Sequence, residues 1–421
     1  MALGAILTLG AVRGAEAQDE SASIAGWLAS LGGALPALPQ NWSDLAVLLR
    51  ASETAEYDDN VLHTPSNSSF RPVRSWVSIS DYGASTKLNW QGQQFFADAD
   101  YGFNRYLEDA ALDLYHYSFD GGVNWVLTSR CSGKLVENAS KTPSQPTQQV
   151  SVNVLNTTTS YGFNETANCG VSRDWGFIFN SGTTTSTNSA AVDKLNNFRN
   201  QFVAAGLTYT VAETNILQLL ATVTGTNYTD RGPLVNLTGL LSKFTEDQIN
   251  LSYTRVINTN LSLIGSIGVV GLTNGDFNLG WPSGWQPQYS FSATWSLTPK
   301  TRLTASVARI VTPPTSVIGN LQRSETAVLD LRYELTPKVS LGVGGAWSLT
   351  SGFGGSLPSG QVSPSQLGPS SRNYSFHATV GYAMTPFLTG NLSYQYFRQI
   401  QAGGLVTPTN LALLTVVYAP Y

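Results

Sequence analysis

The sequence is short of the residues from which catalytic and metal centres are usually made. Its 421 residues include only two cysteines and three histidines, and charged residues make up 12%, about half the usual share for a globular protein. Two cysteines cannot supply a zinc or cluster site of four thiolates. No run of eighteen apolar residues occurs, which excludes a membrane protein built from spanning helices. A net charge of −4 provides no basic surface for nucleic acid.

The sequence has instead a long series of segments in which apolar and polar residues alternate. Strict alternation predicts a β-strand with one apolar and one polar face. Strands of soluble sandwiches average about five or six residues, whereas these segments are long enough for the roughly nine to eleven residues that a membrane strand needs. A barrel that is apolar outside and polar inside also fits the mean hydropathy of −0.06. A soluble all-β repeat protein, such as a propeller, is the alternative.

The segments and the punctuation between them predict eighteen strands. They lie near 46–58, 74–90, 94–105, 113–127, 133–140, 156–165, 174–181, 198–210, 216–226, 246–256, 260–270, 288–297, 301–310, 324–335, 339–349, 373–384, 388–397 and 410–421. Short turns such as Leu-Thr-Pro-Lys at 335–338 alternate with long connections, as in barrels with periplasmic turns and outer loops. The predicted fold is an all-β transmembrane barrel, antiparallel and up-and-down, with eighteen strands and sixteen as the alternative.

The first residues resemble a secretory signal. Residues 5–12 form a short apolar run, and Ala15-Glu16-Ala17 fits a cleavage site. No basic residue precedes the run, so the true start of the chain is left open. The predicted organisation is a signal peptide at 1–17, a periplasmic segment at 18–44 and a β-barrel at 45–421. This organisation predicts the outer membrane of a Gram-negative bacterium.

Aromatic and cysteine residues gather near the predicted short turns. One aromatic girdle of a membrane interface is predicted from Trp125, Tyr209, Tyr253, Trp295, Tyr333 and Tyr382. Tyr421 ends a predicted strand in which Leu413, Thr415 and Val417 share its face, similar to the aromatic-ended last strands that the barrel-assembly machinery reads. Cys131 and Cys169 are expected on neighbouring periplasmic turns, where an oxidising compartment favours a disulfide. Two free thiols beyond bridging distance are the alternative.

The polar faces predict the lining of a lumen. The predicted lining residues are Asp98, Asp100, His116, Asp120, Asn250, Ser292, Thr294, Asp330, Arg332, Glu334 and His377. Carboxylates outweigh cations in this set, so we expect a mild preference for cations or tolerance of neutral sugars. His116, Ser118 and Asp120 share one face, but residues two apart on a strand lie about 6.8 Å apart, too far for a histidine to activate a serine. We therefore predict no catalytic residue, no metal site and no cofactor.

Two motifs carry a resemblance to a known family. Glu56-Tyr-Asp-Asp-Asn-Val61 opens the predicted barrel before a long loop, and hairpins of the Tyr-x-Leu-Thr-Pro-Lys kind follow it. In these motifs the chain, over about residues 45–421, resembles the β-barrel porin 2 family of Gram-negative outer-membrane proteins. The resemblance implies a barrel and, more weakly, a link to exopolysaccharide production and export.

The expected function is a porin-like channel for passive passage of small hydrophilic solutes or saccharides. A conduit or accessory for exopolysaccharide export and a plugged structural or adhesive surface barrel are the alternatives. The expected partners are outer-membrane lipid and lipopolysaccharide, the barrel-assembly machinery and the transported solute or polysaccharide, and no nucleic acid. The oligomeric state is left open.

Overall fold

The computed structural model describes residues 46–61, 73–90, 92–108, 110–144, 156–191, 194–211, 214–231, 242–273, 285–312, 321–353, 371–401 and 406–419. The predicted signal peptide and periplasmic segment lie outside these ranges.

The strands are β1 (Ala46–Asp58), β2 (Ser75–Trp90), β3 (Gln93–Tyr106), β4 (Leu114–Thr128), β5 (Cys131–Ser144), β6 (Asn156–Gly170), β7 (Trp175–Asn188), β8 (Phe198–Thr210), β9 (Asn215–Tyr228), β10 (Lys243–Asn258), β11 (Leu261–Thr273), β12 (Gln286–Thr298), β13 (Thr301–Thr312), β14 (Leu321–Thr336), β15 (Val339–Phe353), β16 (Ser371–Thr385), β17 (Leu388–Gln401) and β18 (Val406–Tyr418). Single 3-10 turns, η2 (Ala110–Leu112) and η3 (Lys194–Asn196), lie between strands. No helix in the described ranges is long and apolar enough to cross a membrane.

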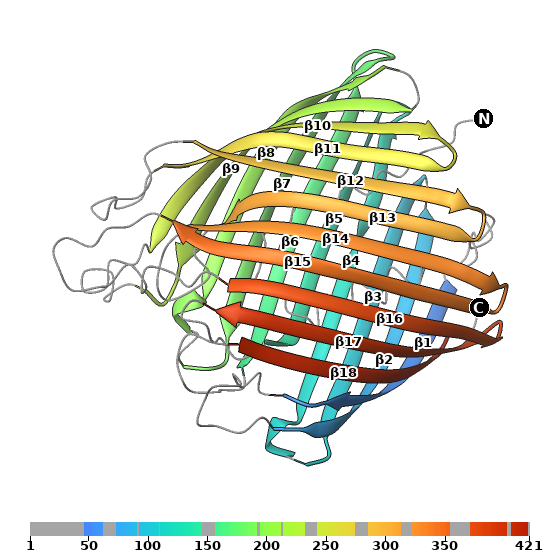
Figure 1. The fold of residues 1–421 in the computed structure, drawn as a ribbon. Helices are drawn as coiled ribbons and strands as arrows, with labels where there is room; N and C mark the ends of the chain where they lie inside the picture. The colour runs from blue at the N-terminus through green and yellow to red at the C-terminus, as the bar shows by residue number, and fades with distance from the viewer. Residues whose placement is uncertain are drawn as a thin grey trace.

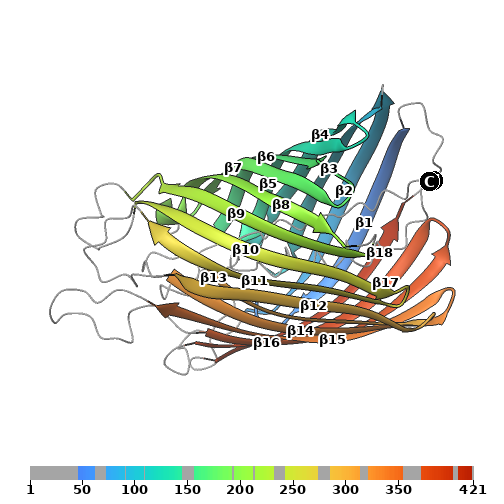
Figure 2. The ribbon, with the colours of Figure 1, turned by 90° about the horizontal axis from the view of Figure 1, so that it is seen from above.

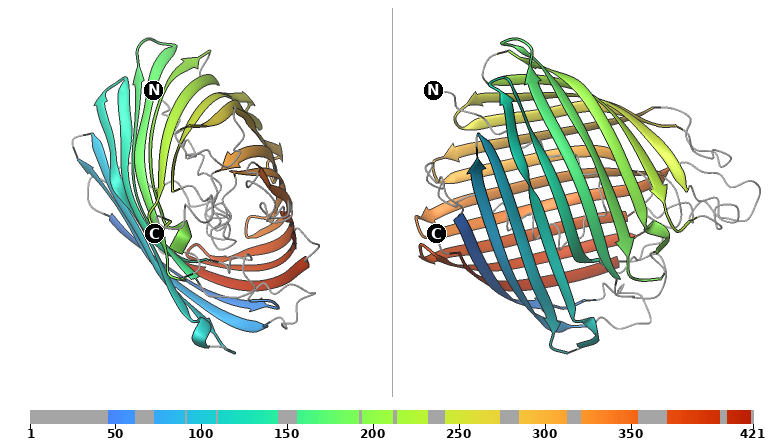
Figure 3. Two further views of the ribbon diagram at one scale, coloured as in Figure 1. Left: turned by 90° about the vertical axis from the view of Figure 1, so that its left-hand side faces the viewer. Right: turned by 180° about the vertical axis from the view of Figure 1, so that it is seen from behind.

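The strands form one closed sheet. Each pairs antiparallel with its neighbours in the chain, and β1 pairs with β18, so that eighteen strands close into a barrel. Figure 1 shows the strands side by side in chain order, and Figure 2 shows β1 and β18 adjacent at the join. The end-on view in Figure 3 shows the ring that they make. A closed sheet has no free edge strand, which is what a barrel needs in order to cross a membrane. The predicted eighteen-stranded barrel is confirmed, and the sixteen-stranded alternative is wrong.

Three predicted strands in the first half of the chain are too short. The strands predicted at 133–140, 156–165 and 174–181 are Cys131–Ser144, Asn156–Gly170 and Trp175–Asn188 in the structure. Pro143 looks like a strand breaker, but it lies beyond the last residue that pairs with β4, where a missing N–H is tolerated. The second half of β7 is a run of Ser, Thr and Asn, which has no apolar alternation for a sequence pattern to detect.

The last strand also differs from its prediction. It runs from Val406 to Tyr418, whereas 410–421 is predicted. Leu413 is 5% exposed and Thr415 7%, while Leu414 is 52% exposed. Leu413, Thr415 and Val417 therefore lie on the inner face of the barrel. Tyr421 lies outside the described residues.

The repeated turn motif has a local explanation. In the β14–β15 turn, Thr336 Oγ1 accepts hydrogen bonds from the backbone N–H groups of Lys338 and Val339 at 3.2 and 3.0 Å. The same bond, from the residue two positions on, recurs at Thr128, Thr298 and Thr385. A threonine that caps its own turn in this way fixes the tight connection between strands. Because consecutive strands alternate in direction, the short turns all lie at one rim, together with the start of β1 and the end of β18.

The two faces of the wall differ in chemistry. On β14, Leu329 and Leu335 are 54% and 48% exposed, and on β16, Phe376 is 45% exposed. The residues that alternate with these face inward and include Asp330 and His377. Strands of 12 to 16 residues are long enough to cross a hydrocarbon layer. An apolar outer face of this extent is the surface that a membrane barrel presents to lipid.

The outer face of β5–β7 is an exception. Glu137 lies opposite Phe163, and Glu165 lies opposite Leu135, so both carboxylates share the apolar face. Ser181 and Thr183 continue this polar area on β7. Charged side chains on a lipid face are destabilising in proportion to their depth. This part of the outer wall is therefore less suited to lipid than the wall formed by β12–β17.

At the join, β1 and β18 pair over only part of their length, and side-chain hydrogen bonds add to this pairing. Pairing runs from Ala51 opposite Tyr418 to Asp58 opposite Leu411. The hydroxyls of Thr54 and Thr415 lie 2.9 Å apart across the join. At the long-loop rim, Asn410 donates hydrogen bonds from its backbone N and Nδ2 to the Asp59 carboxylate at 2.8 and 2.6 Å. These contacts complete the ring where the chain itself does not connect the strands.

Candidate functional site: the charged lining of the lumen

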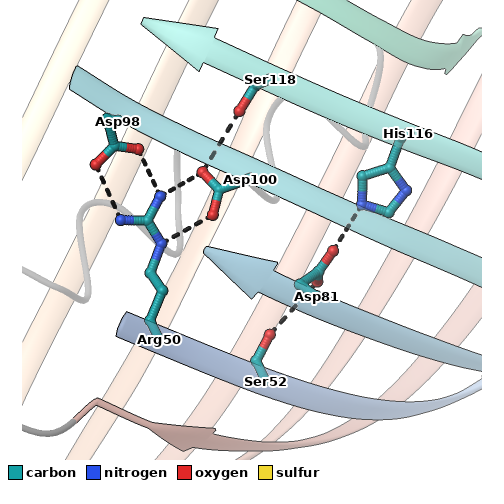
Figure 4. A network of polar contacts seen from close by, with 7 residues as sticks. All are labelled: Arg50, Ser52, Asp81, Asp98, Asp100, His116 and Ser118. Atoms are coloured by element: carbon teal, nitrogen blue, oxygen red, sulfur yellow. Dashed lines mark hydrogen bonds and ion pairs between the residues drawn. The ribbon is translucent and has the colours of Figure 1, made fainter. Parts of the chain in front are cut away.

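The inner face of strands β1–β4 carries a charge network, which we call the β1–β4 wall (Figure 4). Arg50 on β1 extends across β2 and is held between two carboxylates of β3 (Figure 4). Its Nε donates to Asp100 Oδ1 at 2.8 Å, and its Nη1 donates to Asp98 Oδ2 at 3.0 Å. Its Nη2 contacts both carboxylates. Ser118 Oγ on β4 adds a contact of 3.4 Å to Asp100. Every nitrogen of the guanidinium is therefore used.

A glycine makes the reach of Arg50 possible. Gly83 lies opposite Arg50 on one side and opposite Asp100 on the other. A Cβ at this position would collide with the Asp100 carboxylate and with the Arg50 side chain. The bare backbone of β2 thus lets a side chain of β1 meet one of β3.

The same construction joins Asp81 and His116 one strand further. Gly102 on β3 lies opposite both residues, and His116 Nε2 is 2.6 Å from Asp81 Oδ1. A Cβ on Gly102 would strike both groups. Ser52 Oγ donates to the other Asp81 oxygen at 3.4 Å. His116 is thereby held by a carboxylate and Ser118 by Asp100, so no serine in this network is activated by a histidine.

A second bridge of this kind lies on the inner face of strands β13–β16, which we call the β13–β16 wall. Asp330 on β14, Gly344 on β15 and His377 on β16 occupy one register level. His377 Nε2 is 3.2 Å from Asp330 Oδ1, and a Cβ on Gly344 would again displace both. Sequence patterns identify the two histidines separately, whereas their shared Asp-Gly-His construction appears only when the strands are aligned.

The β13–β16 wall also holds two arginines side by side. Arg302 and Arg332 lie directly opposite each other on β13 and β14. Neither forms an ion pair with a carboxylate among the described residues. The Nε of Arg332 is buried and has no hydrogen-bond partner in the described part of the chain. This wall therefore presents open guanidinium groups, whereas the β1–β4 wall presents a paired one.

The predicted lining residues lie on the polar face of their strands, and sequence reasoning missed several of their neighbours. Asp98, Asp100 and His116 belong to the β1–β4 wall, and Asp120 follows on the same face of β4. Asp330, Arg332, Glu334 and His377 belong to the β13–β16 wall. Asn250, Ser292 and Thr294 lie on β10 and β12, away from both networks. The missed cations of the inner face are Arg50, Lys87, Lys134 and Arg302. Gly83 would point to the position of Arg50, but only once the register of β1 and β2 is known.

The inner face is not equally open around the ring. Asp98 and Asp330 keep 39% and 41% of their side-chain surface exposed. From β16 across the join to β2, many inner side chains are almost fully shielded, whereas Arg50, Asp81 and His377 keep 36%, 31% and 23% of their side-chain surface exposed. The inner side chains at 9% exposure or less in this part of the ring are Thr54, Asp58, Ser75, Val77, Thr379, Ser393, Thr407, Thr409, Leu411, Leu413 and Thr415. Solvent therefore reaches Asp98 and Asp330 far better than these side chains around the join.

At the long-loop rim, side chains join the connection between β7 and β8 to the start of the connection after β9. Asn197 donates from Nδ2 to Asp230 at 2.6 Å and accepts from the backbone N of Asn188 at 2.6 Å. Arg231 is fully buried, lies 3.5 Å above the Tyr228 ring and donates from Nε to a backbone carbonyl in η3 at 2.6 Å. Burial lowers the pKa of the Arg231 guanidinium from its usual range. These contacts hold the chain in place on one side of the mouth of the barrel.

The predicted disulfide residues meet at the opposite rim. Cys131 begins β5 and lies directly opposite Cys169 on β6, with Cα atoms 4.1 Å apart, and the two sulfurs are joined. They lie within strands next to the short turns, whereas the sequence places them on the turns themselves. The girdle residues share the outer apolar face near this rim, where Trp295 is 46% and Tyr382 47% exposed. No group of histidine, cysteine and carboxylate residues in the described ranges is arranged to hold a metal ion.

Known proteins show only distant similarity to this chain. No family model and no curated protein matches the sequence. The siderophore receptor PirA from Acinetobacter baumannii is 8% identical, with 90% of this chain and 81% of that chain covered and a TM-score of 0.48. OprD and OccK2 from Pseudomonas aeruginosa are each 12% identical over 89% of this chain and 95% and 97% of theirs, with TM-scores of 0.44 and 0.46. Similarities this low identify no solute or mechanism, and the barrel rests on its own strand pairing.

Proposed function

We propose that this protein is an outer-membrane channel for passive passage of small hydrophilic solutes or saccharides. One observation carries the proposal: an eighteen-stranded closed wall has an apolar outer face and a polar inner face that carries exposed charges. Barrels with sixteen to eighteen strands are wide enough for an aqueous channel. The short-turn rim would face the periplasm and the long loops the outside.

The lining supports a mild preference for cations. The carboxylates on the inner face are Glu56, Asp58, Asp81, Asp98, Asp100, Asp120, Glu246, Asp330 and Glu334, and the cations are Arg50, Lys87, Lys134, Arg302 and Arg332. The excess of carboxylates gives the lumen a negative potential. Much of the remaining lining is Ser, Thr, Asn and Gln, which can exchange the water hydrogen bonds of a hydroxyl-rich solute for weak ones along the wall. Transport of saccharides is a finer proposal within this one.

A second candidate is a barrel whose lumen is largely closed. The shielded inner face from β16 to β2 favours this reading, because an open lumen would wet those side chains as it wets Asp98 and Asp330. Such a barrel would serve as a structural or adhesive surface protein. Conduction of exopolysaccharide, which the family resemblance implies, stays a prediction.

Conductance in a planar bilayer tests the proposal. Purified full-length protein should give stable current steps with a modest preference for cations at low salt. That preference should fade as the Debye length falls from about 30 Å at 0.01 M to about 3 Å at 1 M. Silence under every salt and voltage condition would contradict the channel and favour the closed barrel. A strong preference for anions would contradict the assignment of the acidic faces to the lumen.

A further inference from the structure

Cationic side chains on the outer face are distributed unevenly between the two rims. Those on strand segments near the long loops are Arg105, Lys141, Arg199, Lys243, Arg309, Arg323, Arg372 and Arg398, whereas Arg255 on β10 is the outward cation of the described strands near the short turns. On β14 and β16 the apolar residues of the outer face end where this set begins. The charges therefore mark the edge of the apolar band on the long-loop side.

The set is densest on β13–β17, where Arg309, Arg372 and Arg398 form what we call the rim arginines. Arg309 lies directly opposite Tyr289, and Arg398 lies directly opposite Tyr374. Tyr289 and Tyr374 are 44% and 40% exposed. Tyrosines with cations just beyond them are the pairing expected where a membrane meets its headgroup layer.

Within the described ranges, no carboxylate forms an ion pair with a rim arginine. Glu325 lies opposite Arg309, but its carboxylate contacts Arg323 at 3.4 Å. The Nε of Arg309 is buried and has no hydrogen-bond acceptor in the described ranges. A buried donor that lacks an acceptor carries a free-energy cost, so the Arg309 side chain has room for one further acceptor.

We infer that the rim arginines bind the phosphate groups of a phosphorylated glycolipid of the outer leaflet, the lipid A part of lipopolysaccharide. This inference rests on the proposed outer-membrane location and orientation. Guanidinium groups recognise phosphate oxygens through paired, charge-assisted hydrogen bonds. The apolar face below, with Val307, Leu329 and Phe376, would contact the acyl chains of the same molecule. A soluble anion would use the arginines but not this apolar surface.

Binding of defined lipids to the purified full-length barrel tests this assignment. The probes are diphosphorylated lipid A, lipid A with both phosphates removed, and inorganic phosphate, with binding measured by native mass spectrometry. The variant R309Q/R372Q/R398Q should bind diphosphorylated lipid A at least tenfold more weakly. The matched control R255Q, which removes an outward arginine at the opposite rim, should bind within about twofold of the parent protein.

Several results separate the possible outcomes. Heat-modifiable migration in detergent confirms that each variant is folded, and the single substitution R398Q provides a milder test in case the triple variant does not fold. Restored binding in R309K/R372K/R398K would support a charge-based site.

Equal binding of dephosphorylated lipid A, or equal loss in R255Q, would overturn the inference. Competition by inorganic phosphate at the same concentration as lipid A would assign the site to soluble anions instead. Conductance is measured on the same variants, so a failure of lipid binding with intact current rejects only this inference.

Discussion

The β1–β4 wall and the β13–β16 wall use the same local construction with different electrical results. Each spans a glycine with an Asp–His pair, at 2.6 Å for His116 and 3.2 Å for His377. On the β1–β4 wall a cation is also held between two carboxylates, so the network is internally paired and acidic. On the β13–β16 wall two arginines face each other, and no described carboxylate forms an ion pair with either. The register of the strands, more than the count of charges, therefore decides which charges are left unpaired on the inner face.

The largest expected effect is on the stability of the folded barrel, and it compares the outer face of β14 with that of β5. Leu329→Arg on β14 should destabilise the folded barrel by about 2–4 kcal/mol, because it places arginine in an uninterrupted apolar band. Glu137→Leu on β5 should be neutral or stabilising, because it removes a carboxylate from the apolar face. Unfolding in detergent or lipid, followed by heat-modifiable migration, measures both. Equal tolerance of both substitutions would show that the facing of β14 is wrong, and Asp330→Asn on the inner face is the matched control.

The side of the barrel next to the β1–β4 wall is also expected to carry a covalent link that the β13–β16 wall lacks. Mass spectrometry without reductant should find Cys131 joined to Cys169, and alkylation should label neither. Removal of such a bond commonly costs about 2–4 kcal/mol, so Cys131→Ser/Cys169→Ser should lower the unfolding temperature. Full alkylation of both thiols in freshly isolated membranes would reject the bond.

Ion selectivity should shift in opposite directions when the two walls are altered. Asp98→Asn/Asp100→Asn leaves Arg50 without its two carboxylates and should weaken the cation preference, with a change of a few-fold in permeability ratio. Arg302→Gln/Arg332→Gln should strengthen that preference. The Coulomb energy of one charge at 4 Å in bulk-like water is only about 1 kcal/mol, which limits the size of either shift. Bi-ionic reversal potentials give the ratios, and shifts in the same direction for both variants would contradict the different pairing of the two walls.

The smallest expected effect is the loss of a histidine–aspartate contact when a glycine between the two residues is replaced. Gly102→Ala should displace His116 from Asp81, and Gly344→Ala should displace His377 from Asp330, while stability changes little because the colliding atoms belong to flexible side chains. NMR of isotope-labelled histidine should show one signal altered in each variant, with the other histidine as an internal control. Unchanged spectra in both variants would show that the glycines are not needed for the contacts.

Sequence patterns predicted the architecture much better than the lining. Alternation, turn threonines and aromatic positions are local features, so eighteen strands could be counted from them. Strand ends were missed where local chemistry is ambiguous, as at Pro143 and in the polar half of β7. The contacts of Arg50 depend on three strands aligned in one register, and no local pattern contains that alignment. The shielding of the inner face near the join likewise depends on how the ring closes.

The join between β1 and β18 has a consequence for the order of assembly. The hydroxyls of Thr54 and Thr415 come together from 361 residues apart, whereas all other neighbouring strands are consecutive in the chain. Closing a loop of that length costs roughly 3 kcal/mol more entropy than closing one of about ten residues, so the ring should close after the hairpins have formed. Until then β1 and β18 expose unpaired edges that another sheet can bind. Substitutions that remove the hydrogen bonds between Asp59 and Asn410 would therefore lengthen the lifetime of an open, aggregation-prone sheet, even where the finished barrel is barely changed.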